Sequence, residues 1–211
     1  MDRSTRIVLA PEDRRAEAAL HEYFVRFWDA VSAGDEHEAY DRFVAATPLP
    51  DAVTCDEIDD AGVRGVYCRP DVAIEGRVIL YLHGGGYMLG SARGYRGFAS
   101  QLAVRARAAT FVLDYPLAPA HPLPIALDNV ASARRWLAAH GGGPIALAGD
   151  SAGAGLALAS LADASARVVV GCVAFSPWTD LSLSGASVRD RTIHDPMLDR
   201  GVLHASARQY L

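Results

Sequence analysis

The 211-residue chain contains no lysine, because all 20 of its basic residues are arginine. This absence excludes any reaction that needs a lysine amine, such as Schiff-base catalysis. No window approaches the roughly 18 consecutive apolar residues of a membrane-spanning helix, so we expect no membrane span. The formal net charge is −5 and no basic patch is visible, so nothing favours a nucleic-acid partner.

Cysteine is also scarce, with three residues at spacings that match no metal site. Cys55 and Cys68 fall in two short strand-like runs around residues 59–62, which would let them face each other in a hairpin. Residues 1–10 do not read as a signal peptide, so we expect a cytoplasmic protein. In that compartment buried, reduced thiols are favoured over a disulfide.

Hydrophobic residues make up 51% of the chain and charged residues 21%, which is typical of a globular domain with a substantial core. Residues 12–46 have apolar side chains at three- and four-residue steps and predict one or two helices. Two runs, 53–58 and 63–68, predict an antiparallel hairpin. Buried strands and helices then alternate, with strands at 78–82, 110–113, 145–148 and 168–175 and helices at 99–108, 124–140 and 152–164.

This alternation predicts an α/β fold with a mostly parallel sheet and helices on both faces. After Phe175 the pattern stops, and residues 176–211 contain two short helical stretches but no further buried strand. The run 168–175 would therefore form an apolar sheet edge, which native proteins usually cover. We expect the chain to be a fragment of a protein of roughly 300 residues. The alternatives are a truncated gene product and one piece of a cut or co-assembled protein.

The strongest chemical motif is residues 149–153, which read Gly-Asp-Ser-Ala-Gly and fit G-x-S-x-G. The motif falls between a predicted buried strand and a helix of small residues, the strand–turn–helix setting of a nucleophile elbow. The flanking glycines let the turn tighten, and the start of the helix offers backbone N–H groups. The alternative is a glycine-rich turn that binds phosphate or only packs. The context favours Ser151 as a nucleophile.

A second motif, His-Gly-Gly-Gly-Tyr at residues 83–87, follows the predicted strand 78–82. Acyl transfer builds negative charge on a carbonyl oxygen, and backbone N–H groups stabilise that charge. Consecutive glycines allow the backbone to approach the oxygen closely. This motif accompanies the elbow in lipases and esterases, so the two motifs in this order predict a serine esterase.

Taken together, the motifs resemble the hormone-sensitive-lipase-like, or bacterial type IV, carboxylesterases of the α/β-hydrolase fold. Three further segments resemble the family's D-Y-R-L-A-P-E-H-P-F-P, S-P-W-T-D-L and D-P-M-L stretches, namely 114–124, 176–181 and 195–198. Ala120 and Pro116 depart from the glutamate and arginine usual in the first of them. The resemblance covers about residues 45–200. It implies an N-terminal helical cap at 1–48, a partial hydrolase core at 49–180 and the start of a second cap segment at 181–211.

The resemblance also implies a role for each motif residue. Ser151 would be the nucleophile, and the N–H groups of Gly84, Gly85 and Ala152 would form the oxyanion hole. His83 would brace the glycine loop, by which we mean residues 83–87, and Asp150 would form hydrogen bonds around the elbow. Because backbone donors supply the stabilisation, no metal or organic cofactor is expected.

The base and acid that a catalytic serine needs are not found. In this fold the chain order is serine, acid, histidine, and only 60 residues follow Ser151. Of these, His194 lies in the D-P-M-L segment and His204 in a predicted helix, and neither follows a buried strand. We interpret both as solvated or cap histidines.

The favoured function is hydrolysis of short- to medium-chain carboxylic esters through an acyl-enzyme on Ser151. The substrate would be a small ester, and lactones and aryl esters are equally allowed. The protein partner would be a second copy of the chain in a homodimer or a missing C-terminal segment. One alternative is a binding protein on the same scaffold, like the plant gibberellin receptor, which resembles this family and has lost its catalytic histidine. Another is an inactive remnant.

Overall fold

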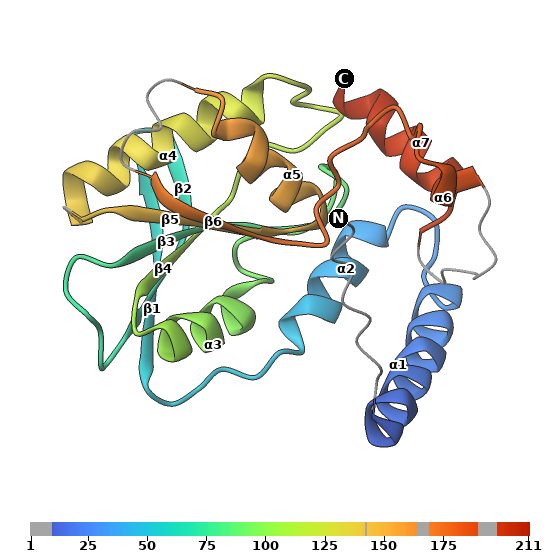
Figure 1. The fold of residues 1–211 in the computed structure, drawn as a ribbon, viewed down its shortest axis with the longest axis horizontal. Helices are drawn as coiled ribbons and strands as arrows, with labels where there is room; N and C mark the ends of the chain where they lie inside the picture. Colours follow the sequence, from blue (N-terminus) through green and yellow to red (C-terminus); the bar gives the residue numbers. More distant parts are fainter. Residues whose placement is uncertain (1–9, 142, 164–168, 190–197) are drawn as a thin grey trace, which may run out of the picture.

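A computed structural model describes residues 10–141, 143–163, 169–189 and 198–211 (Figure 1). The strands are β1 Val53–Asp60, β2 Val63–Pro70, β3 Val78–Leu82, β4 Ala109–Leu113, β5 Ile145–Asp150 and β6 Val169–Phe175. The helices are α1 Pro11–Asp29, α2 Glu36–Ala45, α3 Arg96–Ala106, α4 Ile125–Gly141, α5 Ser151–Ser160, α6 Ala186–Arg189 and α7 Arg200–Tyr210. Of these helices, none is long and apolar enough to cross a membrane.

The strands form one sheet in the order β1-β2-β4-β3-β5-β6. The four strands β4, β3, β5 and β6 run parallel, while β1 and β2 form an antiparallel hairpin that joins the sheet through β4. Figure 1 shows α4 and α5 over one face of the sheet and α3 over the other. The predicted α/β architecture is confirmed.

The core lies in two layers, one on each face of the sheet. Leu80 and Leu82 of β3 pack in the layer that includes residues of α4 and α5. Tyr81, which points the opposite way, packs with residues of α3 and α2. Successive side chains of a strand alternate between faces, so β3 must be apolar at every position when helices cover both sides.

The hairpin places Cys55 directly opposite Cys68, as the sequence suggested. Its turn consists of two residues, Ala61 and Gly62, with φ of 51° and 78°. Two residues with positive φ form the type I′ turn whose twist matches that of paired strands. All three cysteines are free thiols, and Cys68 is fully buried.

The helices differ from the predicted ranges mainly at their ends. Residues 12–46 form two helices, α1 and α2, which pack through aromatic side chains such as Phe24 and Phe43, with ring centroids 4.6 Å apart. α3 ends at Ala106 because Arg107 adopts a left-handed conformation with φ of 50°. α5 ends at Ser160 rather than at residue 164.

Within the described part of the chain, β6 is an edge of the sheet, as predicted. Its apolar side chains are largely open to solvent, with Val170 69% exposed, Val173 54% and Phe175 44%. Central strands of this sheet bury the same residue types completely. β6 therefore leaves an apolar strand edge uncovered in the described residues.

Replacing Leu80 with alanine should lower the free energy of unfolding by roughly 2–5 kcal/mol, because Leu80 is fully buried at the centre of the sheet and its loss leaves a cavity. Leu20→Ala on α1 is the matched control, since Leu20 is 54% exposed, and should change the value by no more than about 0.5 kcal/mol. Urea denaturation measures both. Equal effects of the two substitutions would contradict the assignment of the core.

Candidate active site

Ser151 stands at the junction of β5 and α5, where the strand ends at Asp150 and the helix begins at once. Its φ is 51°, a left-handed conformation that residues other than glycine rarely adopt. Such strain persists only where the surrounding structure imposes it, and it is characteristic of functional turns. The geometry is that of a nucleophile elbow, with the serine on a sharp strand-to-helix turn.

The two glycines of the motif are required by close backbone packing. A Cβ on Gly153 would lie 2.1 Å from the carbonyl oxygen of Leu82, at the end of β3. A Cβ on Gly149 would lie 2.7 Å from the same oxygen. The elbow is therefore pressed against the end of the neighbouring strand, from which the glycine loop starts.

Asp150, directly before Ser151, connects the elbow to that loop. Its Oδ1 accepts hydrogen bonds from the Gly84 amide at 2.9 Å and the Tyr81 hydroxyl at 2.8 Å. Its Oδ2 accepts one from the Tyr95 hydroxyl at 2.9 Å. The Tyr40 hydroxyl of α2 lies 2.8 Å from that of Tyr95, and it is the donor because the Tyr95 proton points to Asp150. The predicted role of Asp150 is consistent with these contacts.

The contact with Asp150 changes the interpretation of Gly84. Its N–H is already donated to the carboxylate and is not free for an oxyanion, which argues against the role predicted for it. Among the described residues, no hydrogen-bond partner is found for the amides of Gly85 and Gly86, which have φ of 113° and 63°. The amide of Ala152 lies in the first turn of α5, where N–H groups have no acceptor within the helix.

His83 is completely buried beneath the glycine loop. Its Nδ1 donates to the Gly84 carbonyl oxygen at 2.7 Å, and its ring stacks on Tyr115 with centroids 4.4 Å apart. Burial lowers the pKa of the imidazole, which favours the neutral form. These contacts fit the bracing role predicted for His83, and they occupy the ring nitrogen that carries the proton.

Three supporting residues were not identified from the sequence. The Tyr115 hydroxyl donates to the His83 carbonyl oxygen at 2.7 Å, and the Trp178 amide donates to the Ser151 carbonyl oxygen at 3.0 Å. Tyr95, as described, holds Asp150. Tyr115 and Trp178 lie in segments that resemble family motifs, which was the available signal, whereas nothing in the sequence marks Tyr95.

A family model described as the alpha/beta hydrolase fold matches residues 79–211. An acetyl-hydrolase of Streptomyces hygroscopicus is 40% identical over 183 residues, covering 82% of this chain and 59% of the relative. A solved esterase from the bacterial hormone-sensitive lipase family has a TM-score of 0.82 at 32% identity, covering 97% of this chain and 70% of that one.

The chain belongs to the alpha/beta hydrolase family. Within it, the similarity to solved hormone-sensitive-lipase-type esterases places the chain in that branch. An esterase of Acinetobacter venetianus, 36% identical over 156 residues, agrees with this placement and is covered over 51% of its length. The chain thus spans between half and three fifths of the length of these curated relatives.

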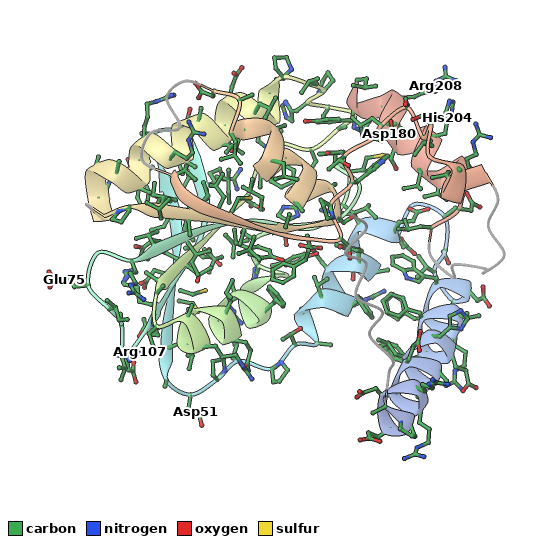
Figure 2. The ribbon with its side chains drawn as sticks, viewed as in Figure 1. Asp51, Glu75, Arg107, Asp180, His204 and Arg208 are labelled. Atoms are coloured by element: carbon green, nitrogen blue, oxygen red, sulfur yellow. The ribbon has the colours of Figure 1, made fainter. Side chains whose placement is uncertain are left out.

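In residues 10–141, 143–163, 169–189 and 198–211 no hydrogen bond joins the Ser151 hydroxyl to a histidine or to any other residue. His204 lies on α7 and is exposed, at the periphery of the molecule (Figure 2). This agrees with its interpretation as a surface or cap histidine. His194 lies outside the described residues, as does most of the D-P-M-L segment.

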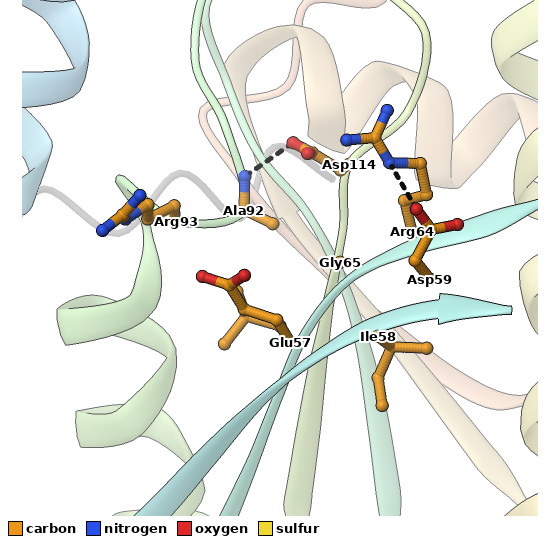
Figure 3. A pocket seen from close by; sticks show the side chains of 9 residues that line it. Glu57, Ile58, Asp59, Arg64, Gly65, Ala92, Arg93 and Asp114 are labelled. Atoms are coloured by element: carbon orange, nitrogen blue, oxygen red, sulfur yellow. Dashed lines mark hydrogen bonds and ion pairs between the residues drawn. The ribbon is translucent and has the colours of Figure 1, made fainter.

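A separate hollow of about 270 Å³ opens beside β1 and β2 (Figure 3). Asp114 on its wall accepts a hydrogen bond from the Ala92 amide at 2.9 Å, and Arg64 pairs with Asp59 at 3.7 Å. Serine, cysteine and histidine are absent from the residues that line it. The hollow therefore offers no acyl-transfer chemistry. In the described ranges no group of three or more potential metal-binding side chains comes together.

Replacing Asp150 with asparagine should lower the free energy of unfolding by roughly 2–4 kcal/mol. Three donors converge on the two carboxylate oxygens, whereas the side chain of asparagine has only one oxygen that can accept. Tyr81→Phe is the control, since it removes one donor while Oδ1 keeps the Gly84 amide, and should cost about 1 kcal/mol. Chemical denaturation compares them. An asparagine variant as stable as the phenylalanine variant would show that Asp150 does not bind as described.

Proposed function

We propose that the protein hydrolyses carboxylic esters through an acyl-enzyme on Ser151. The observation that supports this most directly is the left-handed Ser151 at a strand–helix turn, where Asp150 binds the glycine loop. Two amides of that loop, those of Gly85 and Gly86, have no partner among the described residues. The names of the relatives, acetyl-hydrolase and esterase, agree with such chemistry. Short- to medium-chain acyl groups are the substrates that we propose.

In the proposed reaction, the Ser151 Oγ attacks the ester carbonyl carbon while a base removes its proton. The carbonyl oxygen becomes an oxyanion, which accepts hydrogen bonds from the amides of Gly85, Gly86 and Ala152. Collapse of this intermediate breaks the bond to the alcohol and leaves the acyl group on Ser151. Water then attacks the acyl-enzyme, and the acid is released with regeneration of the serine.

We propose that the base and its orienting acid lie beyond residue 211 in the complete protein. The greater length of the relatives supports this, as does the chain order serine, acid, histidine of the fold. The exposed edge of β6 is where we expect further strands of the same protein to pair. A homodimer through this edge is the alternative occupant.

We further propose that residues 1–48 and 181–211 belong to a cap over a core at 49–180. A contact from α2 to the segment just after the glycine loop supports this, because His37 Nε2 lies 3.2 Å from the Gly90 carbonyl oxygen. On α7, Tyr210 stacks on Tyr87 of the loop with ring centroids 3.8 Å apart. We also propose a cytoplasmic location, which the free thiols support.

The proposal is tested with a p-nitrophenyl ester, comparing the 211-residue chain with the same chain extended by its natural continuation. The short chain should turn over no faster than its Ser151→Ala variant, since no hydrogen-bond partner of the hydroxyl is found among the described residues. The extended protein should lose roughly 10⁴-fold or more of its kcat on Ser151→Ala.

Two results would count against this. Ser151-dependent turnover by the short chain would contradict a base beyond residue 211 and make His194 and His204 the candidates for the base. An extended protein whose hydrolysis is unaffected by Ser151→Ala would rule out the acyl-enzyme.

A further inference from the structure

Cys55 and Cys68 face each other across the β1–β2 hairpin. In a hairpin with a two-residue turn, the closing pair is hydrogen-bonded and the pairs beyond it alternate. Counting outward from Asp60 and Val63, the two cysteines form a pair without backbone hydrogen bonds between them. Side chains approach most closely at such pairs. The two Sγ atoms are 3.3 Å apart.

The two thiols differ in their access to solvent. Both lie on the sheet face beneath α3, where Cys55 Sγ is 3.2 Å from the Ser100 hydroxyl. Cys68 is completely buried, whereas Cys55 is half-buried. Cys55 also borders a hollow of about 230 Å³, whose other lining residues are Leu49, Pro50, Val53 and Arg96. A small molecule can therefore reach Cys55 but not Cys68.

We propose that Cys55 and Cys68 form a reversible redox pair that a low-molecular-weight disulfide converts to an intramolecular disulfide. The Cys55 thiolate attacks one sulfur of the oxidant, forming a mixed disulfide and releasing one thiol. The Cys68 thiolate then attacks the Cys55 sulfur and releases the second thiol. Two protein thiols are oxidised and the oxidant is reduced to two thiols, whose sulfur atoms take up the two protons that the protein thiols lose.

The order of attack follows from burial. Thiol–disulfide exchange proceeds through the thiolate, and desolvation raises the pKa of Cys68. Cys55 is therefore the thiol that meets the oxidant first, and Cys68 resolves the mixed disulfide from the adjacent position. The product joins β1, the outermost strand of the sheet, covalently to β2. This modification site is independent of the proposed esterase activity.

The test uses the unmodified chain, reduced and then incubated with oxidised glutathione, quenched in acid, denatured and alkylated. Trypsin separates the two cysteines because it cleaves after Arg64, giving peptides 43–64 and 65–77, since Pro70 blocks cleavage after Arg69. We expect these peptides to appear as one disulfide-linked species that a reducing agent separates. Cys172 should remain in its own peptide, alkylated or capped by glutathione.

Two variants sharpen the result. Cys68→Ser should stop the reaction at a mixed disulfide between glutathione and Cys55, whereas Cys172→Ser should leave the linked peptides unchanged. The proposal would be overturned if Cys55 and Cys68 were alkylated as fully after incubation with oxidised glutathione as before it. A wild-type reaction that ends at glutathionylated Cys55 would also overturn the proposal, because Cys68 would then fail to resolve the mixed disulfide. The wild-type peptide map decides the matter even where a variant does not fold.

Discussion

The Asp150 carboxylate is the interaction on which the site depends. It accepts the Gly84 amide on one oxygen and the Tyr95 hydroxyl on the other, so it joins the elbow, the glycine loop and the segment before α3. A charged acceptor with several donors holds its partners in fixed positions more strongly than a neutral one. By occupying the amide of Gly84, Asp150 leaves the amides of Gly85 and Gly86 as the loop donors that we propose for the oxyanion.

Around this contact, segments far apart in the sequence brace the same few atoms. Tyr115 binds the carbonyl oxygen of His83, and Trp178 binds that of Ser151. Gly153 lets α5 lie against the end of β3 with no room for a side chain. These contacts hold the elbow and the glycine loop together, as electrostatic stabilisation of a transition state would require.

Much of this arrangement could be predicted from sequence because the signals are local. Continuous apolar runs such as Val78–Leu82 identify the buried strands, and the glycines around Ser151 identify the elbow. The role of Gly84 could not be predicted, since it depends on a contact with a residue 66 positions away. Tyr95 was missed for the same reason. The end of α3 was misplaced because a single left-handed residue, Arg107, stops the helix without a glycine.

Amide hydrogen exchange measured by NMR tests the central claim most directly, because it reports the three glycine amides separately. If Asp150 holds the loop as described, the amide of Gly84 is protected, while those of Gly85 and Gly86 exchange much faster. In the Asp150→Asn variant the protection of Gly84 should fall toward that of its neighbours. Equal exchange of all three amides in the unmodified protein would contradict the account, since Gly84 would then be as available to an oxyanion as the other two.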